Sequence, residues 1–397
     1  MDRELTNYLI SLETKGVRLG LHRTKELLKR CGSPHKQLQI IQIIGTNGKG
    51  STGAIISGLL KTKYKVGLYT SPHLVSYRER IRVQGNVIPT KEVDRFIKKY
   101  RDDISSVGAS FFETMTVMAV WFFKHQKVDF AILETGLGGR HDSVTACRAQ
   151  VQAFTSISID HAHILGPTLL DIANEKIAAI SYGAKVYSVR HSLEIQEAIK
   201  KRCFKQKAEL SFINQSTEKS LSLKGKHQIE NASLAKTIVR HILPDLNQNE
   251  LKEMLATINW PGRNQMLSKT PDIIFDVAHN HAGFESFYNY ISSKKNKRYD
   301  KKILLLSLQK NKEIEKISLV INKMFDLVYY TKTCPDRSMD FEMIKKHIPN
   351  AEIINIPEQA IQKVSKTLKK ADLMAILGTH YWGEYIKNFF NICFDNI

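Results

Sequence analysis

The feature that most constrains the fold is a glycine-rich loop between a run of apolar residues and a helix-like segment. The apolar run spans residues 39–44 (QIIQII), and GTNGKGST follows it. Glycines let the backbone curl so that its N–H groups point inward, and the N-terminus of the next helix adds positive potential. The sequence therefore predicts a nucleotide phosphate-binding loop made of Gly45, Thr46, Asn47, Gly48, Lys49, Gly50, Ser51 and Thr52. Lys49 is expected to reach the terminal phosphates.

This loop departs from the standard Walker A pattern at two places. Ile43 stands five residues before Gly48 where that pattern has glycine, and Gly50 stands where Ser or Thr should follow the lysine. A glycine turn that merely joins a strand to a helix is the alternative interpretation. The strand, loop and helix context favours phosphate binding.

Short β-branched runs, each followed by loop residues and a helix-like segment, recur along the chain and are typical of a parallel α/β sheet. The runs are residues 39–44, 66–70, 130–134, 151–159 and 184–189, and then 273–277, 303–308, 327–331 and 373–377. Ligands of open parallel sheets gather at the carboxyl ends of the strands. Polar clusters follow the first four runs, namely GTNGKGST, TSPH, ETGLGGRHD and DH. These clusters are expected to form one composite site.

The turn sequence WPGR at residues 260–263 separates the two series of strands, and its Pro-Gly pair is typical of an interdomain link. We expect two domains. Residues 1–262 should form an N-terminal P-loop ATPase-like domain with a mostly parallel sheet, and residues 263–397 a smaller C-terminal Rossmann-like α/β domain.

Composition limits the partners and the location of the chain. The formal charge of +20 favours polyanions, and ATP, a substrate with several carboxylates and nucleic acid all qualify. Five scattered cysteines suggest neither a disulfide framework nor a zinc site. No apolar run approaches the length of a membrane helix, which takes about 20 residues. We expect a cytoplasmic protein that binds neither membranes nor nucleic acid.

Phosphoryl transfer also needs hard oxygen ligands for Mg²⁺. Ser71 and Glu134, each just past a predicted strand, can supply them. They are the candidate metal ligands that the residues themselves indicate.

Several blocks, in order along nearly the whole chain, resemble the bacterial folylpolyglutamate synthase / dihydrofolate synthase branch of the Mur ligase superfamily. The loop GTNGKGST matches the P-loop variant of Mur ligases. The further blocks are VGLYTSPHL (66–74), YRERI (77–81), ETGLGGR (134–140), SIDH (158–161), EK (175–176), WPGR (260–263) and DVAHN (276–280).

The resemblance implies roles for further residues. His161 would join Ser71 and Glu134 as a ligand of one or two Mg²⁺ ions. Lys176 would be the lysine that becomes carbamylated, although the family's usual Ala-Gly-Ile is replaced by residues 178–180 (AAI) and a solvent-facing helix lysine is the alternative. ATP would contact Asn231, Arg263 and Asp276. The catalytic residues would be Lys49, Lys176 and His279.

Substrate contacts are also implied by the resemblance alone. They fall on Phe111, Phe112, Glu113, His141, Asp142 and Ser143. The family's LDATN is replaced by HDSVT at 141–145, and a pair of phenylalanines at helical spacing is more often core than ligand cage.

The implied activity is that of an ATP-dependent acid–amino-acid ligase, a tetrahydrofolate synthase or dihydrofolate synthase of folate biosynthesis. A carboxylate of dihydropteroate or of a folate would attack ATP to give an acyl phosphate, from which the amine of L-glutamate displaces phosphate. The family expectation is a monomer. Two alternatives remain: another Mur-type ligase acting on a cell-wall nucleotide precursor, and a basic nucleic-acid-binding P-loop protein.

Overall fold

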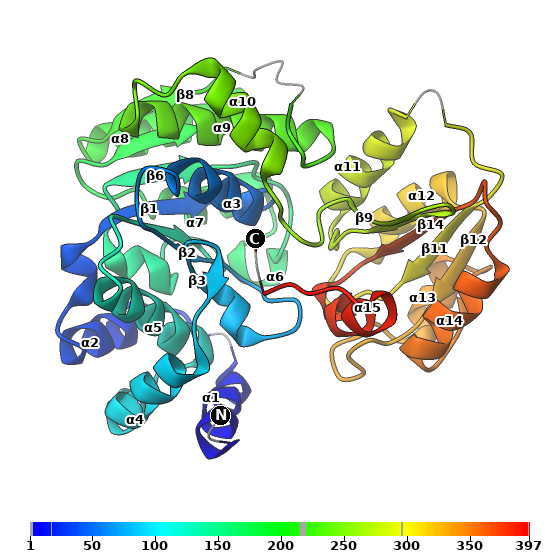
Figure 1. The fold of residues 1–397 in the computed structure, drawn as a ribbon, viewed down its shortest axis with the longest axis horizontal. Coiled ribbons are helices and arrows are strands. Elements are labelled where there is room, and N and C mark those ends of the chain that lie inside the picture. Colours follow the sequence, from blue (N-terminus) through cyan, green and yellow to red (C-terminus); the bar gives the residue numbers. More distant parts are fainter. Residues whose placement is uncertain (1–2, 17, 215–219, 295–296, 396) are drawn as a thin grey trace.

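Two separate β-sheets, each flanked by helices, make up two lobes (Figure 1). Residues of both lobes line a cavity. The structure is a computed structural model, and it describes residues 3–16, 18–214, 220–294, 297–395 and 397. The first lobe contains the sheet built from residues 39–212, and the second contains the sheet built from residues 265–377.

In the described residues the first sheet has eight strands in the order β4-β3-β2-β5-β1-β6-β7-β8. Neighbouring strands are parallel from β2 to β8 in this order, and β3 is antiparallel to both of its neighbours, β2 and β4. Their bounds are β1 (Gln39–Ile44), β2 (Val66–Tyr69), β3 (Ile81–Val83), β4 (Asn86–Val87), β5 (Phe130–Glu134), β6 (Val151–Phe154), β7 (Lys185–Ser188) and β8 (Glu209–Phe212).

Helices bury both faces of this sheet because its central strands are apolar on both sides. Ile40 joins the hydrophobic cluster under α2, α4 and α5, whereas Ile41 and Ile43 join the cluster under α3, α9 and α10. The helices of this lobe are α1 (Arg3–Ser11), α2 (His22–Arg30), α3 (Lys49–Leu60), α4 (Thr90–Val107), α5 (Phe111–His125), α6 (Ala162–Leu165), α7 (Leu169–Ile177), α8 (Leu193–Lys205), α9 (Lys226–Ile242) and α10 (Gln248–Thr257).

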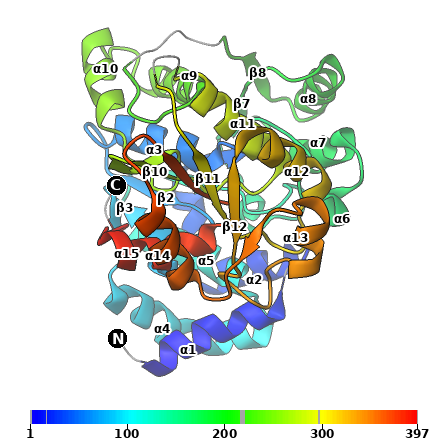
Figure 2. The same cartoon turned by 90° about the vertical axis from the view of Figure 1, so that its right-hand side faces the viewer.

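The second sheet has six strands among the described residues, in the order β13-β12-β11-β14-β10-β9. All neighbours are parallel except β9, which runs antiparallel to β10. The strands are β9 (Gln265–Lys269), β10 (Asp272–Phe275), β11 (Lys302–Leu306), β12 (Leu327–Tyr330), β13 (Glu352–Ile353) and β14 (Leu373–Leu377). The helices are α11 (His281–Ser292), α12 (Ile314–Met324), α13 (Phe341–His347), α14 (Pro357–Thr367) and α15 (Gly383–Phe390), seen from the other side in Figure 2.

Five short 3₁₀ turns complete the described elements. They are η1 (Leu12–Lys15), η2 (Pro34–Gln37), η3 (Tyr77–Arg80), η4 (Ser143–Cys147) and η5 (His380–Trp382).

The predicted fold class, two mostly parallel α/β sheets, is confirmed. Each predicted strand overlaps an observed one, but the run 151–159 is a strand only as far as Phe154. The residues after it turn beneath the glycine-rich loop, where the Ser156 carbonyl accepts hydrogen bonds from Thr46 N and Asn47 N.

None of the helices in the described ranges has both the length and the apolar character that crossing a bilayer requires.

Candidate active site between the lobes

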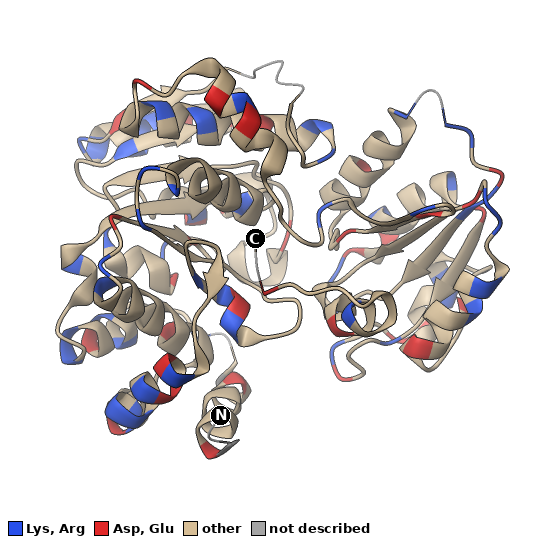
Figure 3. Cartoon of the chain, in the orientation of Figure 1, with Lys and Arg blue, Asp and Glu red and all other residues tan. Residues whose placement is uncertain are grey.

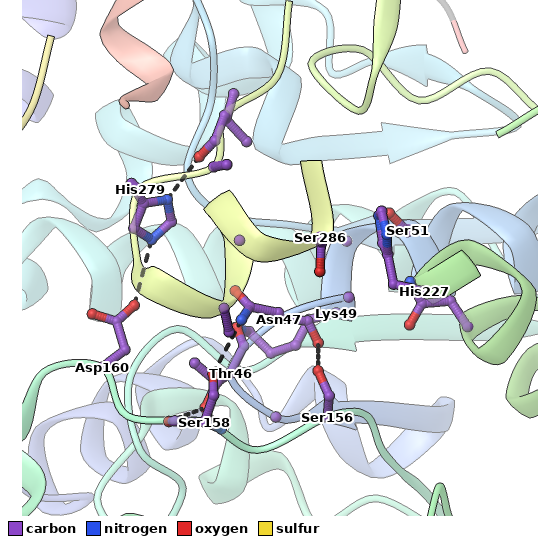
Figure 4. Close-up of a pocket in the computed structure, with 18 of the residues that line it drawn as sticks. Thr46, Asn47, Lys49, Ser51, Ser156, Ser158, Asp160, His227, His279 and Ser286 are labelled. Atoms are coloured by element: carbon purple, nitrogen blue, oxygen red, sulfur yellow. Dashed lines mark hydrogen bonds and ion pairs between the residues drawn. The ribbon is translucent and has the colours of Figure 1, made fainter. Parts of the chain in front are cut away.

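A cavity of about 530 Å³ lies between the lobes, at the carboxyl ends of β1, β5 and β6 and facing β10 and α11. A volume of this size is typical of small-molecule sites, and the position is the one expected for open parallel sheets. Figure 4 shows side chains of both lobes pointing into it, among them Thr46 and Lys49 from the first and His279 and Ser286 from the second. The composite site predicted from the polar clusters is therefore one continuous cavity.

The glycine-rich loop lines this cavity through residues 45–51. Its shape depends on glycine because Gly48 has a φ of +85°, and a Cβ there would lie 2.3 Å from Asn231 Oδ1. The loop leads directly into α3, whose first residue is Lys49, so the helix N-terminus faces the cavity. The Lys49 ammonium lies 3.0 Å from Thr46 O and 4.0 Å from Glu134 Oε1. This arrangement can hold phosphate groups.

Ser71, Glu134 and His161, the predicted metal ligands, all line the cavity. Ser71 N donates to Glu134 Oε2 at 3.1 Å. Burial raises the pKa of Glu134, and the Lys49 ammonium opposes part of that rise. Burial also lowers the pKa of His161 to about 4, so the ring is neutral near pH 7 and has a free electron pair for a metal.

These donors fit a divalent cation, since a carboxylate, a hydroxyl and a neutral imidazole line the same cavity. No three His, Cys, Asp or Glu side chains of the described ranges are grouped closely enough to hold a metal by themselves. Oxygen atoms of a bound nucleotide would have to complete the coordination.

Lys176 is buried rather than solvent-facing, which excludes the alternative interpretation of this lysine. Its ammonium donates to Gly45 O at 2.9 Å, directly beneath the glycine-rich loop, and it lines the cavity. Burial first, and then the charge of Lys49, lowers its pKa to about 7. Much of the amine is therefore deprotonated near neutral pH, which is the form that reacts with CO₂.

The predicted ATP-binding residues of the second lobe and of α9 also reach the cavity, since Asn231, Arg263 and Asp276 line it. Asp276 is held by two backbone N–H groups, Asn264 N at 2.7 Å and Ala278 N at 2.8 Å. Its carboxylate therefore shapes the loop before His279. Asn231 donates to Gln228, which in turn donates to Ser51 Oγ, so α9 supports the glycine-rich loop.

A hydrogen-bonded network centred on Asp160 joins the lobes across the cavity. Asn280 Nδ2 donates to Asp160 Oδ2 at 3.0 Å and to Asn47 Oδ1 at 3.1 Å. The ring of His279 lies with Nδ1 2.8 Å from Val277 O and Nε2 3.4 Å from Asp160 Oδ2 (Figure 4). Burial alone would raise the pKa of Asp160, but His279 and Lys312 together hold it well below its usual range.

Lys312 belongs to this network and was not predicted from the sequence. Its ammonium lies 2.7 Å from Asp160 Oδ1. It stands in a lysine-rich stretch, QKNKEIEK at 309–316, which as letters is typical of a solvated surface. The available signal was position, because this stretch follows β11 as the other polar clusters follow their strands.

A second missed group is a set of basic side chains beside His380, which lines the cavity. Arg80 Nε donates to His73 Nδ1 at 2.9 Å. Burial, and then the charge of Arg80, lowers the pKa of His73 to about 3. The pKa of His380 is also lowered, by burial first and then by His73, His279, Arg80 and Arg337. This region can accept carboxylates.

The predicted substrate-binding residues do not line the cavity. Phe111 packs in the core, and Phe112 packs against Gly136, where a Cβ would lie 2.5 Å from its ring. Glu113 forms the capping box of α5 with Ser110 and pairs with Arg23.

The second segment predicted to contact substrate, residues 141–143, also lies outside the cavity lining. Asp142 accepts from Gly136 N and Leu137 N, Ser143 bonds Thr24, and His141 is exposed. Burial raises the pKa of Asp142 to about 6, although the hydrogen bonds from backbone N–H groups oppose the rise. Phe112 and Asp142 thus support residues 136–137 of the cavity wall, and contact of the six predicted residues with substrate stays a prediction.

Known proteins resemble this chain in sequence and structure. Residues 262–380 match the family described as Mur ligase, glutamate ligase domain. The dihydrofolate synthase/folylpolyglutamate synthase of Bacillus subtilis is 32% identical over 306 residues, which cover 68% of this chain and 71% of that protein. The chain spans only 37% of a longer Haloferax volcanii relative, a probable bifunctional folylpolyglutamate synthase/dihydropteroate synthase that is 30% identical over 309 residues, or 70% of this chain.

Solved structures agree in fold. Escherichia coli FolC in complex with DHPP and ADP superposes with a TM-score of 0.86 at 26% identity, covering 98% of this chain and 97% of that one. A Yersinia pestis folylpolyglutamate synthase/dihydrofolate synthase complexed with AMPPNP and Mn ion gives a TM-score of 0.88 over 98% of both chains. At 24% identity that second likeness shows the fold alone. The chain belongs to the dihydrofolate synthase/folylpolyglutamate synthase family of ATP-dependent ligases.

Proposed function

We propose that this chain joins L-glutamate to a carboxylate of dihydropteroate or of a folate, using ATP and passing through an acyl phosphate. The observation that carries the proposal is the single cavity in which the glycine-rich loop of the first lobe faces His279 and Arg263 of the second. Ligation through an acyl phosphate needs this arrangement, because ATP, the acceptor carboxylate and the amine must meet while water is excluded.

The phosphate end of the cavity supports the first step. Backbone N–H groups of the loop, the N-terminus of α3 and Lys49 would hold the β- and γ-phosphates of ATP. The acceptor carboxylate oxygen then attacks the γ-phosphorus, ADP leaves, and the acyl phosphate forms. Arg263 and His279, from the other wall, would face the charge that develops on the phosphoryl group.

Ser71, Glu134 and His161 would hold Mg²⁺ at this end, and a bound cation would neutralise phosphate charge as the bond to ADP breaks. Carbamylation of Lys176 is part of the proposal. It is supported by the burial of the amine, its pKa of about 7 and its position under the loop. A carbamate there would turn a cation into an anion beside the phosphates and their metal.

Carboxylates of the substrates would lie toward Arg80, His73 and His380. His380 lines the cavity and Arg80 and His73 lie beside it, and the Arg80 guanidinium, which also lies over the Phe111 ring, supplies the positive charge because burial keeps both histidines neutral near pH 7. Both L-glutamate and the glutamyl tail of a folate carry carboxylates, so a cationic region suits either. The general excess of Lys and Arg is spread over the helices of both lobes, interleaved with Asp and Glu (Figure 3).

We also propose that the two domains meet between residues 262 and 263, and that the protein is a cytoplasmic monomer. A monomer is supported because residues of this one chain suffice to line the cavity from both lobes. A cytoplasmic location is supported by the need for ATP.

The test is ADP release by the purified protein with ATP and Mg²⁺. Dihydropteroate and tetrahydrofolate are compared as acceptors, each with and without L-glutamate. Glutamate-dependent release with dihydropteroate identifies a dihydrofolate synthase, release with tetrahydrofolate identifies a folylpolyglutamate synthase, and release with both identifies a bifunctional enzyme. If folded protein releases ADP with neither acceptor, the proposal is wrong, and a cell-wall nucleotide precursor and then RNA would be tried.

A further inference from the structure

The end of the chain returns from the second lobe to the first. After α15, residues 391–395 cross the gap and reach β3 of the first lobe, as the red end of the ribbon shows in Figure 1. The contact there is made by Arg82, a β3 residue that is only 2% exposed. Its Nη2 donates to Phe394 O at 2.6 Å, and its Nη1 donates to Asp395 O and to Gly85 O.

This contact uses the fork of the guanidinium, whose two terminal nitrogens bond successive carbonyls of the returning segment. A buried arginine without such acceptors would be an unsatisfied charge. Moving residues 394–395 away would remove two of the three carbonyls that accept from Arg82 and leave Gly85 O.

The returning segment is also anchored at its other end. Phe394 is buried in the hydrophobic cluster of the second lobe with Phe275, Trp382 and Ile386. Leu74 and Val75 of the first lobe pack against the same cluster. Residues 391–395 thus bridge the two lobes, with an apolar anchor on one and a cationic clamp on the other.

The bridge lies beside the covalent link between the lobes. A small cavity of about 50 Å³ is lined by Arg82 and Phe394 on one side and by Trp260 and Pro261 of the link on another. Arg263 and His380, which line the active-site cavity, also line this one. The covalent link and residues 391–395 are thus two connections at one place, and together they restrict how the lobes can twist. The contacts of Asp160 with Lys312 and Asn280 are made elsewhere, across the main cavity.

We propose that Arg82 is a positioning residue. Together with residues 391–395 it forms a second connection between the lobes, beside the covalent link at residues 260–263, and this pair of connections forms the hinge that sets how the lobes close. The inference rests on the proposed function for its kinetic consequence. With the clamp released, the lobes would close in a wider range of orientations. Arg263 and His380 would then face the phosphate loop less precisely, and water would reach the acyl phosphate.

The kinetic test compares Arg82→Met, which keeps the length of the side chain, with Arg82→Lys and with Arg30→Met. Arg30 is a matched control because it is paired within the first lobe, with Glu26 and Asp103, away from the hinge. Arg82→Met should raise the KM for L-glutamate about tenfold and release ADP in excess of amide formed, with a smaller change in kcat. Arg82→Lys should have a ratio of ADP to amide between those of Arg82→Met and the wild type, and Arg30→Met should match the wild type. Unchanged KM and a 1:1 ratio of ADP to amide in folded Arg82→Met would overturn the proposal.

A double-mutant cycle with Phe394→Ala separates the hinge from general loss of stability. If Arg82 and Phe394 act through the same connection between the lobes, the effects of Arg82→Met and Phe394→Ala on the ratio of ADP to amide should be strongly non-additive in the double variant. Melting temperatures are measured in parallel. Additive effects would show that Arg82 and Phe394 do not act through one connection.

Small-angle scattering with AMPPNP tests the hinge without any turnover. Arg82→Met should have a broader distance distribution than the wild type, and identical curves would overturn the inference. If the wild type fails to release ADP, the proposed function is wrong, but the scattering experiment still decides the role of Arg82.

Discussion

Lys312 Nζ lies 2.7 Å from Asp160 Oδ1, and this ion pair joins the second lobe to the first with both side chains almost completely buried. Asn280 and His279 contact the other oxygen of the same carboxylate. One anion of the first lobe is thus contacted by three side chains of the second, beside the phosphate loop. This carboxylate therefore links the two lobes at the cavity.

Lys312→Met should weaken activity far more than it weakens the fold. In the closed form Asp160 would lose its ammonium partner, and an uncompensated buried charge costs about 3–5 kcal/mol, whereas opening the lobes rehydrates it. We expect kcat/KM to fall about 100-fold with a melting temperature near that of the wild type. Lys316→Met is the control, because Lys316 pairs with Glu313 on an exposed helix surface. Equal activity of Lys312→Met and Lys316→Met would remove the ion pair from the mechanism.

Lys49→Ala should abolish ADP formation and leave the protein folded. The ammonium faces the cavity, so its loss removes a phosphate contact rather than core packing. Removal of one such donor typically lowers turnover about 100- to 1,000-fold. ADP release and far-UV circular dichroism are measured together, with the exposed Lys63→Ala as the control. Normal turnover in Lys49→Ala would show that the loop does not handle the transferred phosphate.

Carbamylation of Lys176 predicts chemical rescue. Lys176→Ala should lose most activity and regain part of it when a short carboxylic acid is added, because the acid can occupy the place of the carbamate. Lys185→Ala, a partly exposed lysine on β7, should be unaffected by the acid. Full activity of Lys176→Ala without any addition would contradict the carbamate.

The lowered pKa of Lys176 also predicts a pH dependence of stability, measured without CO₂ or metal. The folded pKa is about 7 and the ordinary value is 10.5, so between these values the unfolded chain binds the additional proton. Stability of the wild type should therefore rise with pH across this window, and the part contributed by Lys176 is lost as pH falls toward 7. Lys176→Met removes the titrating group, so its melting temperature relative to the wild type should be highest near pH 7 and decline toward pH 10. A constant difference would show that the amine has an ordinary pKa.

Removal of divalent metal should stop ADP formation, and Mn²⁺ as well as Mg²⁺ should restore it. Glu134→Gln keeps the size of the side chain and removes its charge, so this variant should need a higher metal concentration for half-maximal activity. Glu92→Gln, on α4 in the first lobe, is the control. Undiminished turnover in excess EDTA would exclude the metal from catalysis.

The sequence could predict those parts of the fold that depend on local pattern. The apolar runs of β1, β5 and β14 and the polar clusters after the strands indicated both sheets and the position of the cavity, and both are confirmed. Strands β8 and β9 were missed because their residues are exposed or only partly buried and show no apolar run, and β13 was missed because it is only 2 residues long. The division at residue 262 stays a prediction.

Contacts between distant segments could not be predicted. The Arg82 clamp uses backbone carbonyls of residues 394 and 395, which every sequence possesses, so no motif marks it. Lys312 looks like a surface lysine until β11 places it opposite Asp160. The predicted substrate residues do not line the cavity, and their contact with substrate stays a prediction. Glu113 and Asp142 are engaged in helix capping and loop support, which a motif cannot distinguish from ligand binding.

The central claim, ligation through an acyl phosphate, is tested most directly with an acceptor whose carboxylate carries ¹⁸O. When the carboxylate oxygen attacks the γ-phosphorus and the amine later displaces phosphate, the bridging oxygen leaves with that phosphate. The account predicts one ¹⁸O in the inorganic phosphate for each amide formed in the presence of ATP, Mg²⁺ and L-glutamate. Amide formation with unlabelled phosphate would contradict it.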